Sequence, residues 1–270
     1  MNRAHAFRIG ARWCGTLFFI LIAAVTMPPN LRSQTLSRVF PPEAFMTDGN
    51  TWSTVPFSAG PANARFQQVC DATGFQFGIP GPFLIQGLLL REDQLHQNGF
   101  FSRFPDFQIN LSTTTRSVDG LSSVFSENIG ADNQSVVPRG ALNVGISAST
   151  PFGGGGDGAA IFFATPFFYD PTRGNLLLDI FNFGGGSTSW GVPPFSGPAY
   201  VDASSVSGDW VSSLVATDVH ASSGSLSTMG LVTRLLFTPV PEPSTWALMM
   251  AVVIAIWISR KRSRQHPKHA

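Results

Sequence analysis

Few residues of this chain combine the type and the spacing that catalysis requires. Between residues 34 and 240 there are two histidines, His96 and His220, and neither lies in a His-Glu-x-x-His spacing. The many serines are not accompanied by a Gly-x-Ser-x-Gly nucleophile elbow. Cys70 has no evident basic partner to activate a thiolate, so we expect a buried apolar role. We therefore predict no enzymatic activity and no catalytic residues, with an extracellular polysaccharide hydrolase as the less favoured alternative.

Acidic residues next to turns could bind a cation. Asp170 and Asp179 flank a turn segment, and calcium takes carboxylate and carbonyl oxygens. Aspartates in turns more often cap their own loop, which is the competing interpretation. We therefore assign no metal site and keep calcium as a candidate cofactor only. The glycine run at 153–158 lacks the Lys and Ser or Thr of a phosphate-binding loop, so we expect a hairpin loop before a strand at 159–163.

Aromatic side chains are the candidates for ligand binding. Sugar rings stack on aromatic faces, and amide and carboxylate groups then accept or donate hydrogen bonds. Each aromatic residue can equally belong to the core or its rim. The candidate platforms are Trp52, Tyr169, Trp190, Tyr200 and Trp210.

The charge distribution separates the middle of the chain from its ends. Residues 34–240 contain eight arginines, no lysine and fifteen acidic residues, a net charge of −7, although the whole chain has a formal net charge of +1. An acidic domain repels phosphate backbones, so we exclude nucleic acid as a partner.

The C-terminal segment carries the most specific pattern. Pro241-Glu242-Pro243 is followed by an uncharged apolar run at 246–258 and then by Arg260, Lys261, Arg262 and Arg264. Prolines keep the tripeptide extended, and a short apolar helix can hold a protein in a bilayer when basic residues snorkel. Trp246 and Trp257 lie near the two ends of the run, where aromatic rings prefer the membrane interface. The basic cluster is expected to stay in the cytoplasm.

This three-part C-terminus resembles the PEP-CTERM sorting signal. The resemblance implies recognition and processing by an exosortase-type enzyme, in Gram-negative bacteria that make exopolysaccharide. It covers about residues 240–264, and the tail at 265–270 is longer than the pattern requires. Segments at 65–70, 107–112 and 165–179 also look like segments of uncharacterised PEP-CTERM proteins, which supplies no activity.

The N-terminus resembles a signal peptide. Arg3, Arg8 and Arg12 precede an apolar run at 13–25. The expected organisation is a signal peptide at 1–33, an exported domain at 34–238, a sorting signal at 239–264 with a transmembrane helix at 245–259, and a cytoplasmic tail at 265–270.

Periodicity predicts the fold of the exported domain. Apolar and polar residues alternate at 107–112, 142–147, 176–181 and 231–237, and apolar runs at 83–90 and 159–163 fit buried strands. Turn signals separate these segments, and there is no helical stripe between the termini. We predict an all-β fold, an antiparallel β-sandwich of jelly-roll or Greek-key style.

The function expected from these observations is that of an exported surface or extracellular-matrix protein with a structural or adhesion role. It would be anchored by one C-terminal span in the inner membrane until an exosortase processes it. A glycan-binding module of the exopolysaccharide matrix is the alternative, with exopolysaccharide as a candidate partner.

Overall fold

A computed structural model describes most of the chain between residues 35 and 240, together with part of a C-terminal helix. The described residues are 35–57, 63–76, 81–96, 99–146, 158–190, 195–240, 250, 252–257 and 260. Several predicted features lie outside these residues, namely the signal peptide at 1–33, Pro241, Glu242, Pro243, Trp246, Lys261, Arg262, Arg264 and the tail at 265–270.

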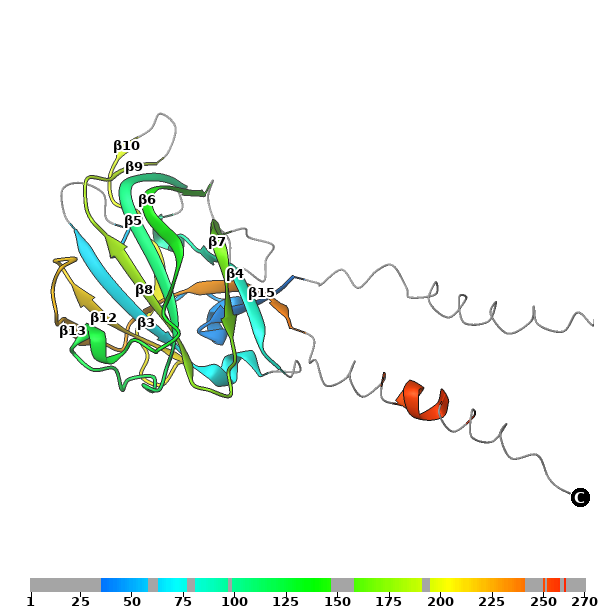
Figure 1. Ribbon diagram of the computed structural model, residues 1–270. Helices are drawn as coiled ribbons and strands as arrows, with labels where there is room; N and C mark the ends of the chain where they lie inside the picture. Colours follow the sequence, from blue (N-terminus) through cyan, green and yellow to red (C-terminus); the bar gives the residue numbers. More distant parts are fainter. Residues whose placement is uncertain are drawn as a thin grey trace, which may run out of the picture. The chain divides into compact units, whose positions relative to one another are not determined.

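The described part of the exported domain consists of β-strands and short 3-10 helices (Figure 1). The strands are β1 (Leu36–Phe40), β2 (Thr51–Ser53), β3 (Ala64–Cys70), β4 (Phe83–Leu90), β5 (Phe100–Thr114), β6 (Gln134–Ile146), β7 (Ala159–Tyr169), β8 (Asn175–Asn182), β9 (Ser187–Trp190), β10 (Phe195–Ser196), β11 (Val201–Ser204), β12 (Val211–Ala216), β13 (Ser225–Ser227), β14 (Gly230–Leu231) and β15 (Thr233–Pro239). The 3-10 helices are η1 (Pro42–Phe45), η2 (Ala72–Phe75), η3 (Gln94–His96) and η4 (Phe125–Glu127).

The strands form three antiparallel sheets. One has the order β1-β15-β4-β7, and the largest has the order β10-β9-β5-β8-β3-β12-β13 with β6 paired to β5. A small third sheet has the order β14-β11-β2. The prediction of an antiparallel all-β fold is confirmed, and each of the six predicted strand segments overlaps a strand of the structure.

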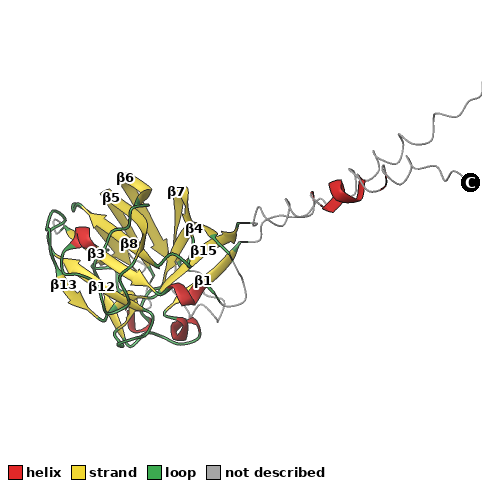
Figure 2. Ribbon diagram, turned by 60° about the horizontal axis from the view of Figure 1, so that its bottom comes forward, coloured by secondary structure: helices red, strands yellow, loops and turns green. Residues whose placement is uncertain are grey.

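The main core receives side chains from both large sheets. Figure 2 shows the strands of these sheets in yellow. On β4, Phe83, Ile85, Leu88 and Leu90 are buried, as the apolar run predicts. The strands of the large sheet supply further members of the same cluster, including Phe66, Phe107, Ile109, Leu178 and Ile180. Burying alternate apolar positions of two sheets against each other stabilises both, because each sheet has one face that water would otherwise contact.

The chain enters and leaves the exported domain on neighbouring strands. Leu36 of β1 pairs with Phe237 of β15, and Pro239, where β15 ends, pairs with Phe83. At the other end of the same strands, Thr233 pairs with both Phe40 and Leu90. Eight residues of β4 separate these two ends, which corresponds to about 26 Å. The sheet therefore has an end from which the chain continues to the sorting segment and an opposite end.

The C-terminal segment is described only in part. Met250, residues 252–257 and Arg260 are helical, and Trp257 is exposed. Within the residues that the structure describes, no helix has both the length and the apolarity needed to cross a bilayer. The predicted span at 245–259 also includes residues outside the described set.

Candidate functional site

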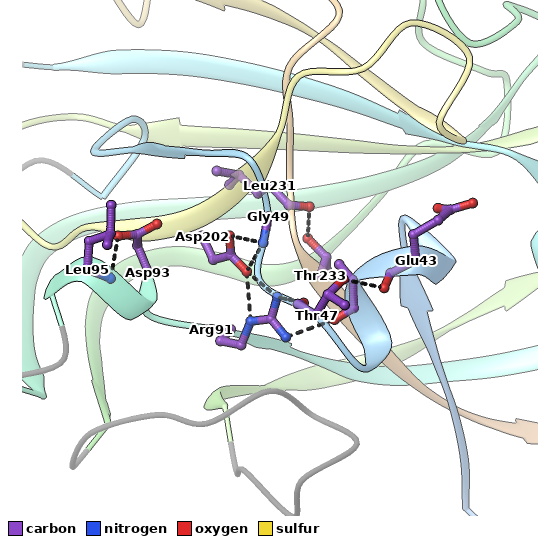
Figure 3. Close-up of polar contacts among 10 residues, drawn as sticks. Glu43, Thr47, Gly49, Arg91, Asp93, Leu95, Asp202, Leu231 and Thr233 are labelled. Atoms are coloured by element: carbon purple, nitrogen blue, oxygen red, sulfur yellow. Dashed lines mark hydrogen bonds and ion pairs between the residues drawn. The ribbon is translucent and has the colours of Figure 1, made fainter.

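A buried ion pair lies at the end of the β4 strand that is opposite to the chain exit. Arg91 follows β4 directly, and its guanidinium contacts the carboxylate of Asp202 on β11 through Nε and Nη2, the Nε–Oδ2 distance being 2.7 Å (Figure 3). Neither side chain is exposed to solvent. Arg91 also donates to the carbonyl oxygens of Ala44 and Thr47, each at 2.8 Å. The pair therefore connects the end of β4 and strand β11 to η1 and to the segment that follows it.

The same segment has a close backbone approach at Gly49. The Gly49 N–H donates to Asp202 Oδ1 at 3.0 Å, as Figure 3 shows. A Cβ at Gly49 would lie 2.0 Å from the carbonyl oxygen of Ala203, so no other residue fits this backbone position without a shift. This segment leads directly into β2. Trp52, the central residue of β2, pairs with Asp202 of β11. The buried ion pair thus fixes the strand that presents Trp52.

Three carboxylates converge beside Arg91. One oxygen from each of Asp48, Asp93 and Asp202 lies within 4.8 Å of the others. Burial and the neighbouring Asp93 raise the pKa of Asp48, and one buried oxygen of Asp48, Oδ1, has no hydrogen-bond partner. Burial also raises the pKa of Asp202 to about 7, against the opposing effect of Arg91. Oxygen ligands of this kind suit calcium, but here the Arg91 guanidinium already supplies positive charge to Asp202.

The carboxylate cluster does not have the arrangement of a glycosidase pair. Asp93 and Asp202 are 2% and 0% exposed, so a glycosidic bond cannot reach the space between them. Asp93 Oδ1 instead accepts the Leu95 N–H at 3.0 Å and lies 2.9 Å from Nδ1 of His96. The role of Asp93 is therefore to hold the short helix η3 and the imidazole of His96.

Three aromatic rings form a corner next to this network. The rings of His96 and Tyr200 are stacked, with centroids 3.8 Å apart and an interplanar angle of 12°. Trp52 stands almost perpendicular to both, at 86° to Tyr200 and 74° to His96, with centroid distances of 4.9 and 5.5 Å. Trp52 is 42% exposed and the His96 side chain is 30% exposed. We call Trp52, His96 and Tyr200 the aromatic corner.

The structure separates the five predicted aromatic platforms. Trp52 and Tyr200 come together in the aromatic corner. Tyr169 was a wrong candidate because it is fully buried in the core, where its hydroxyl donates to the Gly174 carbonyl at 2.9 Å. Trp210 is half-buried and packs against the main core. The side chain of Trp190 lies outside the described residues, although its backbone belongs to β9.

The two aspartates considered for calcium already have protein partners. Asp170 Oδ1 accepts the backbone N–H and the hydroxyl of Thr172, which is the turn-capping alternative. Asp179 accepts Nε and Nη2 of Arg65 at 3.1 and 2.7 Å. His220 is exposed, 6.2 Å from the ring of Phe183 by centroid distance, and does not join His96.

Sequence reasoning missed Arg91, Asp48, Asp93 and Asp202, because antiparallel pairing brings them together from three distant segments. One signal was present in the sequence. Arg91-Glu92-Asp93 follows the apolar run of β4 without a turn residue, and three charged residues directly after a buried strand are costly unless they are paired.

Cys70 provides a direct test of burial in the core. It is 1% exposed, and burial raises the pKa of its thiol to about 12. Because only the thiolate is a good nucleophile, we expect no measurable alkylation of Cys70 by iodoacetamide at pH 8 in the native protein, and complete alkylation in 6 M guanidinium. Mass spectrometry of the peptide containing Cys70 measures both. Rapid native labelling would contradict the described packing of β3.

Comparison with known proteins identifies the C-terminal segment. No curated protein matches the chain. Residues 239–263 match the family model for the PEP-CTERM protein-sorting motif. This range begins at the last residue of β15 and includes the Pro-Glu-Pro tripeptide, the apolar run and three residues of the basic cluster, Arg260, Lys261 and Arg262. The chain therefore carries a PEP-CTERM protein-sorting motif at these residues, and this motif suggests an exported protein that an exosortase processes.

Proposed function

We propose that this chain is a cell-surface or extracellular-matrix protein with a structural or adhesion role and without enzymatic activity. The observation that supports the proposal is the PEP-CTERM motif at residues 239–263. A sorting motif directs its protein outside the inner membrane, and the remainder of the described chain is one antiparallel β domain. In this proposal the segment at 1–33 is a signal peptide, and the β domain is a sandwich.

The proposed anchor acts before processing. The segment 245–259 crosses the inner membrane once, with Trp246 and Trp257 at its two interfaces. Arg260, Lys261, Arg262 and Arg264 hold the tail in the cytoplasm. Pro241-Glu242-Pro243 then lies at the outer surface as an extended stretch, where the exosortase recognises it.

Processing is tested by intact-mass analysis of the protein from exosortase-positive and exosortase-deleted cells. We expect loss of everything beyond roughly residues 241–245 in the positive strain only. A variant with alanine at Pro241, Glu242 and Pro243 should stay uncleaved in both strains, because the extended recognition stretch is lost. Glu43→Ala, which replaces an exposed acidic residue of the β domain, is the control and should be cleaved normally. An uncleaved wild-type C-terminus in the positive strain contradicts the proposal.

A second candidate function, glycan binding within an exopolysaccharide matrix, is supported by one observation. The aromatic corner presents partly exposed Trp52 beside Tyr200 and His96. Aromatic faces with a few fixed polar groups are the ordinary composition of a sugar-binding surface. Binding of the full-length protein to any of a panel of soluble oligosaccharides, measured by calorimetry, tests this function independently of processing.

A further inference from the structure

The aromatic corner is held by structure rather than by chance packing of surface side chains. The Asp93 N–H donates to the Tyr200 carbonyl at 3.0 Å, and Glu92 forms a β-bridge with Val201. Asp93 Oδ1 lies 2.9 Å from Nδ1 of His96, which fixes that ring over Tyr200. Each ring therefore comes from an element that is tied to its neighbour by backbone hydrogen bonds, and little side-chain entropy is left to lose on binding.

Trp52 is fixed from the other side of the corner. Its backbone pairs with Asp202 of β11, and Asp202 forms the buried ion pair with Arg91. Residues directly opposite in an antiparallel pair project from the same face, so the buried charges lie on the face of the small sheet from which Trp52 projects. Even so, 42% of the Trp52 surface is exposed. A large apolar ring that is both fixed and exposed is a feature of binding surfaces rather than of cores.

The corner also lies where a ligand can reach it. The chain leaves the domain for the sorting segment beside Phe83, at one end of β4. Arg91, Asp93 and His96 follow Leu90, at the other end of the same strand, about 26 Å away along β4. The corner is therefore at the end of the four-stranded sheet that is opposite to the end at which β15 leads toward the sorting segment.

We propose that the aromatic corner binds a pyranose ring of a β-linked, gluco-configured glycan, with Trp52 as the stacking platform and His96 as a hydrogen-bonding partner. Pyranoses whose hydroxyl groups are all equatorial present an apolar C–H face, which matches an indole face. Two ring planes at nearly a right angle contact such a sugar on its face and along its edge. Because Asp93 engages Nδ1 of His96, Nε2 is the imidazole atom that remains to contact a sugar hydroxyl. This inference rests on the second proposed function and assigns it a ligand class and a site.

The test is calorimetry of the full-length protein in detergent with soluble β-1,4-linked hexasaccharides of glucose, N-acetylglucosamine and xylose. We expect the wild-type protein to bind at least one of them. The dissociation constant of Trp52→Ala should be higher by more than about tenfold, which is typical of truncating an aromatic hot-spot residue. Trp52→Phe keeps a ring and should bind within about threefold of wild type, on the same scale of binding energies.

The matched control is Phe45→Ala. Phe45 lies in η1, is 44% exposed like Trp52, and is not part of the aromatic corner. The affinity of the Phe45→Ala variant for the hexasaccharide should equal that of the wild-type protein. Thermal unfolding of Trp52→Ala, Trp52→Phe and Phe45→Ala should show that all three fold.

The possible results separate the site from the function. Wild-type binding that persists undiminished in Trp52→Ala overturns the site and leaves glycan binding as a function. Equal losses in Phe45→Ala and Trp52→Ala overturn the site as well. A wild-type protein that binds none of the three hexasaccharides overturns the assigned ligand class; binding to other oligosaccharides of the panel would still support glycan binding.

Discussion

Replacing Asp202 with asparagine is expected to lower the free energy of unfolding by about 3–5 kcal/mol, the usual cost of removing one partner from a buried ion pair. Arg91 cannot release its proton, and its guanidinium is 0% exposed, so the positive charge stays buried without the anion that contacts it. The neighbouring hydrogen bonds from Arg91 to Ala44 and Thr47 do not replace a negative charge. Asparagine avoids the burial of charge that raises the pKa of Asp202 to about 7, and this offsets part of the loss, but it leaves the Arg91 guanidinium without a counter-charge. Urea denaturation of the full-length protein at pH 8, where Asp202 is ionised, measures the net loss.

The same chemical change at an exposed pair is the control for Asp202→Asn. Asp106 accepts hydrogen bonds from Nε and Nη2 of Arg139 at 2.8 and 2.7 Å, one on each carboxylate oxygen, and this pair is in contact with solvent. Water screens this pair, so Asp106→Asn should leave the unfolding midpoint almost unchanged. If Asp202→Asn and Asp106→Asn lower the free energy of unfolding equally, burial of the Arg91–Asp202 pair does not increase the cost of removing its carboxylate.

A double-mutant cycle keeps the prediction testable if Asp202→Asn fails to fold. Arg91→Met with Asp202→Leu removes both charges and fills their space with apolar atoms. We expect this double variant to be less destabilised than the sum of its single changes, because neither charge is left buried alone. Strict additivity would contradict a direct interaction.

The strands of this protein could be predicted from sequence because one face of each is buried. Along β4, Phe83, Ile85, Leu88 and Leu90 alternate with less buried residues, except where the pairing shifts near Gly87. Alternation of this kind is a local property, so a window of a few residues is sufficient to detect it. The segment at 83–90 was predicted from its short apolar run, which is equally local, and it has the same bounds as β4.

The aromatic corner could not be assembled in the same way. Trp52 and Tyr200 were both candidates, but their contact depends on the pairing of β2 with β11, across about 150 residues of sequence. Nothing in the local pattern distinguishes Trp52, which is exposed, from Tyr169, which is buried. Aromatic residues serve equally well on a core face and on a binding face, so residue type alone leaves the choice open.

The buried ion pair of Arg91 and Asp202 could not be predicted from sequence for a related physical reason. A charged residue directly after a strand is usually exposed, whereas Arg91 is among the largest fully buried side chains of the described residues. A buried guanidinium is tolerated only where several acceptors converge, and those acceptors come from η1, the segment after it and β11. Convergence of this kind is a property of the folded chain, and no spacing within one segment encodes it.

The core also contains a fully buried aromatic residue that lies outside the strands. Phe75 belongs to the 3-10 helix η2 and is fully buried. Its ring centroid lies 4.9 Å from those of Phe40 and Tyr169, 5.8 Å from that of Phe237 and 6.0 Å from that of Phe83. The capping bond from Thr73 N–H to Asp71, at 2.8 Å, holds η2 in this position.

Phe75→Ala is therefore expected to lower the free energy of unfolding by about 3–5 kcal/mol, since it removes a ring that four aromatic neighbours surround and leaves a cavity. Phe75→Leu, which fills part of that space, should lose less, and both are measured by urea denaturation of the full-length protein. The matched control is Phe162→Ala on β7, where the ring is 71% exposed and the expected change is within about 0.5 kcal/mol. If Phe75→Ala and Phe162→Ala are equally stable, the packing of Phe75 of η2 against its four aromatic neighbours does not stabilise the domain. Strand pairing and the remaining aromatic contacts must then stabilise it.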